Sequence, residues 1–291
     1  MHSDVSQFAL TAPPTLEAVL QQLATEPGKQ TPIAGGTEIM VALGVGRLPQ
    51  RSFVSIQHLR ELRFIRVDAD AIHIGAGVTF TDIRRSKEIA DDLPLLIQSA
   101  SWTGSVANQN RGTLGGNICN ASPAADTPPA LLAYGAAVTL ISSAGLRTVR
   151  YEDFHLGYKK TLLRPDELLH TITVPRNFSG YRQYIRKIGT RNAQAISKTA
   201  LAAVAKIEGD IIADIRLGAA SLADRPLRCA ATEAALLNRS VAPAHLEVTI
   251  KAARAALAGE AKPIDDIRST GKYRAAVAAN LLEEFLRSLA S

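Results

Sequence analysis

Thr113-Leu114-Gly115-Gly116-Asn117 decides how this chain folds around a ligand, because its glycine pair has a counterpart in Ala34-Gly35-Gly36-Thr37-Glu38. Both pairs follow apolar or β-prone residues and precede small hydroxyl or amide side chains. Paired glycines let the backbone adopt positive φ and let its N–H groups approach a ligand without an intervening Cβ. One pair alone is usually only a turn. Two pairs predict a split cradle that holds one diphosphate between segments distant in the sequence.

The length and composition allow more than one hydrophobic core, since the chain has 291 residues of which 46% are hydrophobic. Its two cysteines, Cys119 and Cys229, are too few for an iron–sulfur cluster, which needs about four ligands. Residues 1–4 lack the basic start of a secretion signal. No stretch reaches the roughly 18 apolar residues of a membrane span. We therefore expect a cytoplasmic protein with reduced thiols.

The net charge of +6 raises the question of a nucleic-acid partner, but the basic residues are scattered and aromatic residues make up only 5%. We therefore expect no nucleic acid. The basic residues are better explained by an anionic cofactor and an acidic partner surface. The sequence contains no histidine pair or Cys-x-x-Cys at metal-ligand spacing, no G-x-G-x-x-G, no Walker A and no G-x-S-x-G motif. It predicts neither a metal ligand nor a catalytic residue.

The order of expected elements divides the chain near residue 178. Apolar residues at helical spacing predict a helix over 15–25, Pro94 begins another over 94–107, and 136–150 is expected to form a hairpin. Beyond Pro175 the expected strands are 181–188, 201–207 and 211–217, and the expected helices are 229–237, 244–258 and 272–289. Strands followed by helices predict a separate α+β domain.

Candidate binding residues gather at the glycine motifs and just beyond them. Residues 32–39 offer backbone N–H groups and the Thr37 hydroxyl, and residues 113–117, expected to be a loop, offer the same groups. The Asp126 carboxylate could accept hydrogen bonds from ribose or ribityl hydroxyls, or it could cap a helix that begins at Pro128. Lys187 lies in a basic group that could neutralise a flavin or phosphate charge or form a solvated strand edge.

Four stretches, 32–38, 113–126, 166–175 and 187–198, resemble the flavin-binding subunit of the molybdenum hydroxylases, the family of xanthine dehydrogenase and carbon monoxide dehydrogenase. The resemblance covers nearly the whole chain. It implies an α+β fold with a two-subdomain FAD-binding domain of the PCMH type over residues 1–178, the subdomains being about 1–58 and 59–178. A C-terminal α+β domain, with a three-stranded sheet plus helices, would follow over 179–291.

The resemblance also implies which residues hold FAD. Thr103, next to Trp102, stands where some relatives have a stacking aromatic residue. Leu169 would pack near the adenine or the flavin ring, Asp126 would bind a cofactor hydroxyl, and Lys187 would lie beside the flavin. The full set implied is Pro32, Ile33, Ala34, Gly35, Gly36, Thr37, Glu38, Ile39, Thr103, Thr113, Leu114, Gly115, Gly116, Asn117, Asp126, Leu169 and Lys187.

The function implied is that of an electron-transfer subunit with noncovalent FAD. Electrons would come from [2Fe-2S] clusters of an iron–sulfur subunit, a third subunit would carry molybdopterin, and FAD would pass electrons to NAD or another acceptor. The chain lacks the cysteines for clusters of its own. Two alternatives remain open: a stand-alone flavin-dependent reductase or oxidase of a related fold, and a flavin-binding scaffold without enzymatic activity.

Overall fold

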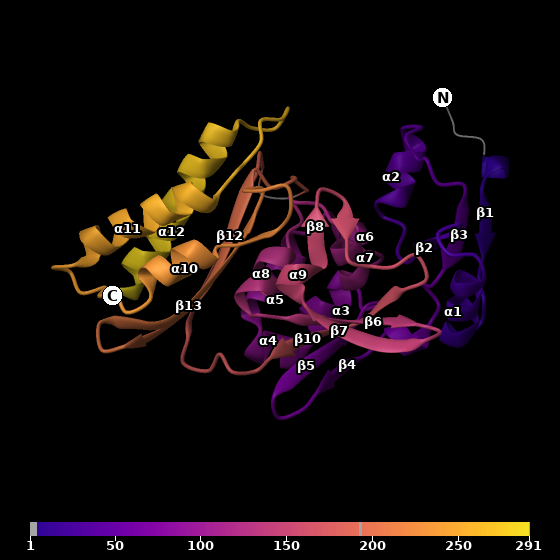
Figure 1. Cartoon of the computed structure of the whole chain (residues 1–291), viewed down its shortest axis with the longest axis horizontal. Coiled ribbons are helices and arrows are strands. Elements are labelled where there is room, and N and C mark those ends of the chain that lie inside the picture. The colour runs from indigo at the N-terminus through magenta and orange to yellow at the C-terminus, as the bar shows by residue number, and fades with distance from the viewer. Residues whose placement is uncertain (1–4, 192–193, 291) are drawn as a thin grey trace.

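The three larger sheets follow one another from the N-terminal part of the molecule to its C-terminal helices in the computed structural model (Figure 1). The structure describes residues 5–191 and 194–290. Residues 1–4, which carried the expectation about a secretion signal, lie outside the described part. Within that part, no helix is long and apolar enough to cross a membrane.

The N-terminal sheet is parallel and small, with strand order β1-β3-β2. Its strands are β1 (Ala9–Thr11), β2 (Thr31–Ile33) and β3 (Ser52–Ser55), accompanied by α1 (Leu16–Thr25), α2 (Ile39–Gly44) and the 3₁₀ turns η1 (Val5–Gln7) and η2 (Arg60–Leu62). Helix α1 begins after Thr15, whose hydroxyl accepts the N–H of Ala18. Its buried face consists of the expected apolar residues, Leu16, Val19, Leu20 and Leu23.

The central unit is a five-stranded antiparallel sheet in the order β4-β5-β10-β6-β7. The strands are β4 (Ile65–Val67), β5 (Ala71–Gly75), β6 (Ala137–Ser142), β7 (Gly145–Arg150) and β10 (Leu168–Pro175), so the expected hairpin is confirmed as β6–β7. The accompanying elements are α3 (Phe80–Arg85), α4 (Lys87–Asp92), α5 (Pro94–Trp102), α6 (Val106–Gln109), α7 (Leu114–Cys119), α8 (Pro128–Ala133) and α9 (Tyr151–Phe154), with the small hairpin β8 (His155–Gly157) and β9 (Lys160–Thr161).

Two expectations for the central unit were wrong. The helix expected over 94–107 ends at Trp102, because Gly104 adopts a left-handed φ of +63° and Ser105 caps a new helix, α6. The second glycine motif, expected to be a loop, forms helix α7. The side chain of Thr113 accepts the backbone N–H of Gly116 at 3.0 Å and so begins that helix.

The C-terminal sheet is antiparallel, with strand order β11-β12-β13-β14. The three expected strands are present as β11 (Arg182–Ile188), β12 (Thr199–Glu208) and β13 (Ile211–Ala220), and the two-residue strand β14 (Leu227–Arg228) makes the sheet four-stranded instead of three-stranded. Helices α10 (Ala230–Leu236), α11 (Leu246–Glu260) and α12 (Gly271–Leu289) cover one face. Alternate residues of β12 therefore enter two cores, Leu201 and Ala203 facing these helices, and Ala202 and Val204 facing the central unit.

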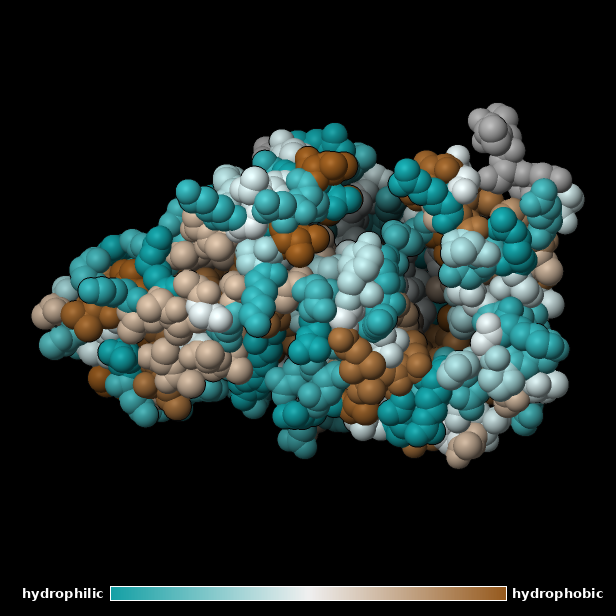
Figure 2. All heavy atoms as spheres, turned by 45° about the horizontal axis from the view of Figure 1, so that its top comes forward, coloured by the Kyte–Doolittle hydropathy of each residue, from teal (hydrophilic) through white to brown (hydrophobic). Residues whose placement is uncertain are grey.

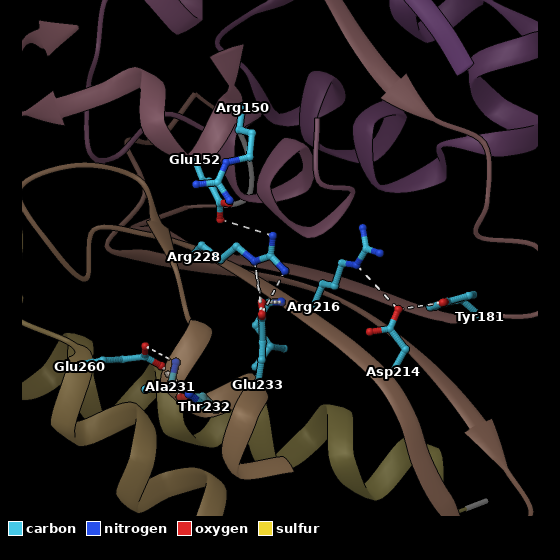
Figure 3. A network of polar contacts seen from close by, with 11 residues as sticks. Arg150, Glu152, Tyr181, Asp214, Arg216, Arg228, Ala231, Thr232, Glu233 and Glu260 are labelled. Atoms are coloured by element: carbon cyan, nitrogen blue, oxygen red, sulfur yellow. Dashed lines mark hydrogen bonds and ion pairs between the residues drawn. The ribbon is translucent and has the colours of Figure 1, made fainter. Parts of the chain in front are cut away.

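Close packing and ion pairs hold the C-terminal sheet against the central unit. Gly218 of β13 lies so near α8 that an added Cβ would stand 2.2 Å from the carbonyl oxygen of Pro129. In Figure 3, Arg228 reaches from β14 to Glu152 of the central unit (3.4 Å) and to Glu233 of α10 (3.1 Å). The sheet is thus seated against both the central unit and its own helices.

Candidate cofactor site

The two glycine motifs, distant in the sequence, are brought together by a direct backbone contact. An added Cβ on Gly35 would lie 1.8 Å from the carbonyl oxygen of Arg111, two residues before the second motif begins at Thr113. The Arg111 guanidinium donates to Gln57 Oε1 at 3.0 Å, which links the central unit to the N-terminal unit a second time. In Figure 2 a recess separates the right-hand part of the molecule, which holds the N-terminal sheet, from the central part.

The first motif presents unpartnered backbone donors. Gly36 adopts a φ of +73°, the left-handed conformation expected for a glycine pair. No described residue accepts a hydrogen bond from the backbone N–H of Gly36, Thr37 or Glu38. Backbone N–H groups need water or a ligand when the chain gives them no acceptor. Three consecutive donors on a left-handed turn fit an anionic group such as a diphosphate.

The second motif contributes differently from what was expected, because the backbone donors from Leu114 to Asn117 are already used within the chain. The N–H groups of Leu114 and Gly115 donate to Val78 O (2.9 Å) and Ala76 O (3.0 Å). Those of Gly116 and Asn117 donate to the hydroxyl and carbonyl oxygens of Thr113, both at 3.0 Å.

The glycines of this motif instead permit close packing and an open surface. A Cβ on Gly115 would stand 2.6 Å from Ala76 Cβ, so glycine lets α7 sit directly on the end of β5. Gly116 is exposed and neither glycine has a left-handed φ. The Asn117 side chain is half-buried and its Oδ1 accepts from Thr127 at 2.6 Å. The motif therefore provides a surface on which Gly116 carries no side chain, and it does not provide a second run of free backbone donors.

Asp126 joins the central unit to the C-terminal domain through a nearly buried ion pair. Its Oδ2 lies 2.7 Å from Lys187 Nζ, and the two side chains are only 11% and 10% exposed. Its Oδ1 accepts from the Ser197 hydroxyl at 2.8 Å, and Lys187 also donates to the Trp102 carbonyl at 3.3 Å. Burial raises the pKa of the Asp126 carboxyl, opposed by Lys187 and Ser197. A carboxylate has about four lone-pair sites, so this one retains acceptor capacity for a ligand hydroxyl.

The alternative reading of Asp126 as a helix cap was wrong. The residue at the cap position of α8 is Thr127, and no side-chain hydrogen bond caps that helix. The helix instead begins with Pro128 and Pro129, which supply no backbone N–H and have the φ of a first turn. The Asp126 carboxylate is thereby left to face Lys187 and Ser197.

Leu169 lies in the hydrophobic core, whereas Thr103 lies at the end of a helix close to the Asp126–Lys187 ion pair. Leu169 lies in β10, is 4% exposed and belongs to the main hydrophobic core, where packing alone accounts for it. Thr103 ends α5, and its hydroxyl donates to Ser99 O at 3.0 Å. It follows Trp102, whose carbonyl accepts from Lys187, so Thr103 lies close to the ion pair. The contact of either residue with a ligand stays a prediction.

Three residues near the motifs were not among the candidates. Ser197 lies in the stretch that resembled the known family, but nothing in its surroundings distinguished it from other serines. Arg111 and Lys159 carry no local signal at all, because their partners lie far away in the sequence. Only the tertiary structure could have selected them. Among the described residues, no three His, Cys, Asp or Glu side chains converge on a metal-sized site.

Comparison with known proteins agrees with this architecture. The family described as "FAD binding domain in molybdopterin dehydrogenase" matches residues 6–177, and the one described as "CO dehydrogenase flavoprotein C-terminal domain" matches residues 184–289. The xanthine dehydrogenase FAD-binding subunit of Escherichia coli O157:H7 is 30% identical over 264 residues, which cover 89% of this chain and 88% of that one.

A second relative and a solved structure extend the comparison over nearly the whole chain. The glyceraldehyde dehydrogenase medium chain of Sulfolobus acidocaldarius is 28% identical over 89% of this chain and 90% of its own. The carbon monoxide dehydrogenase structure from Hydrogenophaga pseudoflava superimposes with a TM-score of 0.89 at 28% identity, covering 96% of this chain and 95% of that one.

The chain belongs to the FAD-binding domain family of the molybdopterin dehydrogenases. Within it, the chain is an FAD-binding subunit of a molybdenum hydroxylase-type dehydrogenase, an oxidoreductase. The resemblance and the α+β fold class expected from the sequence are confirmed. The unpartnered donors of the first motif and the remaining acceptor capacity of Asp126 fit the diphosphate and the hydroxyl groups of FAD.

Proposed function

We propose that this chain is the electron-transfer subunit of a molybdenum hydroxylase. In this proposal it receives electrons from the [2Fe-2S] clusters of an iron–sulfur subunit and passes them to NAD or another acceptor. A separate subunit carries the molybdenum cofactor and transforms the substrate. When bound, FAD supplies the centre that takes up and releases these electrons. The observation that carries the cofactor site is the run of three unpartnered backbone N–H groups at Gly36, Thr37 and Glu38. The electron-transfer role is supported by the relatives, which are subunits of dehydrogenases.

The residues of the chain bind and orient the cofactor, and none is given a catalytic role. Residues 32–39 hold the diphosphate through backbone donors. Residues 113–117 form the opposite wall, with Gly116 leaving room because it has no side chain. The Asp126 carboxylate accepts from a cofactor hydroxyl, while Lys187 and Ser197 orient it and oppose the rise in its pKa that burial causes. Thr103 and Leu169 complete the proposed set.

The domain boundaries are proposed as 1–178, with subdomains of about 1–58 and 59–178, and 179–291. Three separate hydrophobic clusters support this division. One is built around α1 and β3, one around the five-stranded sheet, and one between the C-terminal sheet and α10–α12. We retain the cytoplasmic setting as part of the proposal, since Cys119 and Cys229 are unpaired thiols.

Noncovalent attachment of FAD can be tested by acid precipitation of the purified, yellow protein. We expect the flavin to appear in the supernatant, because noncovalent contacts are lost when the chain unfolds. Flavin that remains with the precipitated protein after washing would contradict noncovalent binding.

The electron-transfer role requires the complex. We expect the hydroxylase substrate to bleach the flavin absorbance when the FAD-loaded chain is mixed with the cluster-bearing and molybdenum subunits. The isolated FAD-loaded chain is the matched control and should stay oxidised. If it is reduced by that substrate as fast as the complex, the role is that of a stand-alone flavin reductase or oxidase. Family membership argues against this alternative and against a scaffold without activity.

A further inference from the structure

We propose that Lys159 is a further FAD-binding residue, whose ammonium group contacts the diphosphate from the turn of the β8–β9 hairpin. This inference rests on the proposed position of FAD between the two glycine motifs. Lys159 is distant in the sequence from both motifs, but its ammonium group contacts Glu38 of the first motif and Asn120, which follows the second.

The contacts of Lys159 span the two halves of the site. Its Nζ lies 3.2 Å from Glu38 Oε1, at the end of the first motif, and 2.5 Å from Asn120 Oδ1, where α7 ends. Its backbone N–H donates to the Ala121 carbonyl at 3.2 Å, which fixes the hairpin on the segment that follows α7. The hairpin therefore delivers one cation to the place where the N-terminal and central units meet.

The backbone of Lys159 indicates that this placement has a cost. Its φ of +55° is left-handed, a conformation that glycine adopts easily and a lysine side chain disfavours. The Lys159 side chain is 37% exposed, and the polar contacts of its ammonium group hold it in this place. A glycine would relieve the strain, but it would remove the ammonium group from the site.

The charges at the first motif explain what this ammonium group does. Glu38 places a carboxylate beside the three backbone donors, where it would repel a bound diphosphate. Lys159 neutralises that carboxylate and adds an attraction for the phosphate oxygens. The backbone of Arg111 also lies beside the first motif, but its guanidinium donates to Gln57.

The test is FAD affinity of the deflavinated full chain, measured by flavin fluorescence quenching in dilute buffer. Lys159→Met keeps a long, unbranched side chain and leaves the left-handed backbone of residue 159 unrelieved, but it removes the charge. We expect affinity for FAD to fall by about fivefold, the size expected for a partly exposed charge contact. The matched control is Lys160→Met, since Lys160 is also exposed in the same hairpin and pairs with no described carboxylate. It should change affinity less than twofold.

The double variant Lys159→Met/Glu38→Gln separates electrostatics from structure. If Lys159 acts through charge, removing the uncompensated carboxylate should restore at least half of the lost binding free energy. Lys159→Arg should bind FAD within twofold of the wild type. Unchanged affinity of the Lys159→Met protein, a loss that Glu38→Gln does not restore, or an equal loss in Lys159→Arg would overturn the inference. A wild-type chain that binds no FAD would instead refute the proposed function, so the two failures are distinguishable.

Discussion

Lys187→Met should destabilise the protein because it leaves the Asp126 carboxylate in a nearly buried place with Ser197 as its remaining partner. Removing one member of a buried ion pair costs about 3–5 kcal/mol. Since the two side chains retain 10–11% exposure, we expect a loss of about 2–4 kcal/mol. At roughly 2–4 °C for each kcal/mol, the thermal midpoint should fall by about 5–15 °C.

The pH dependence of this loss has a definite sign. Burial already raises the folded-state pKa of Asp126, and removing Lys187 takes away an interaction that lowers it. The unfolded pKa remains near its usual value of about 3.9. A raised carboxyl pKa means that stability is greatest below the unfolded value and is lost as pH rises through the folded one. The Lys187→Met protein should therefore lie nearest to the wild type in acid and farthest from it at neutral pH.

The assay is thermal unfolding of the deflavinated chain followed by circular dichroism between pH 5 and 8. The matched control is Asp126→Asn/Lys187→Met, in which an amide replaces the unpaired charge and can still accept from Ser197. It should recover at least half of the stability lost in the single variant. Equal stability of the single and double variants, or a single-variant loss under about 0.5 kcal/mol, would refute the idea that an uncompensated charge is the cause.

Two other predictions concern positions outside this ion pair. Gly35→Ala should lower the thermal midpoint and abolish FAD binding, because its Cβ would stand 1.8 Å from the Arg111 carbonyl oxygen, whereas Gly44→Ala, with open space around it, should do neither. Normal flavin titration of Gly35→Ala would contradict this. Arg147 holds the pKa of Glu167 below its usual value, so this carboxylate stabilises the fold above about pH 4.3 and less as pH falls through the folded pKa. Glu167→Gln should cost about 1–3 kcal/mol at pH 7 in a denaturation experiment and much less near pH 3; a cost independent of pH would exclude the ion pair as its source.

The helices and strands with regular apolar patterns were predictable from the sequence. The two errors, at α5 and α7, have local causes. The apolar spacing of α1 and the alternation in the β6–β7 hairpin are repeated signals, so single residues could not obscure them. Helix α5 stops at Trp102 because one glycine adopts a left-handed φ, and the pattern of apolar residues does not record φ. Helix α7 was missed because paired glycines resemble a turn until the Thr113 cap is known.

The sequence by itself determined the family and the cofactor class, which follow from local motifs that do not depend on how the chain is folded. The count of two cysteines also belongs to the sequence alone, and it is the basis of the prediction that iron–sulfur clusters lie in partner subunits. Only the tertiary structure decided how the site is divided. Gly35 lies against Arg111, the run of three free donors at residues 36–38 belongs to the first motif, and Lys159 joins Glu38 to Asn120. The physical reason is that hydrogen bonds and charge contacts act over a few ångströms in space, whatever the separation along the chain.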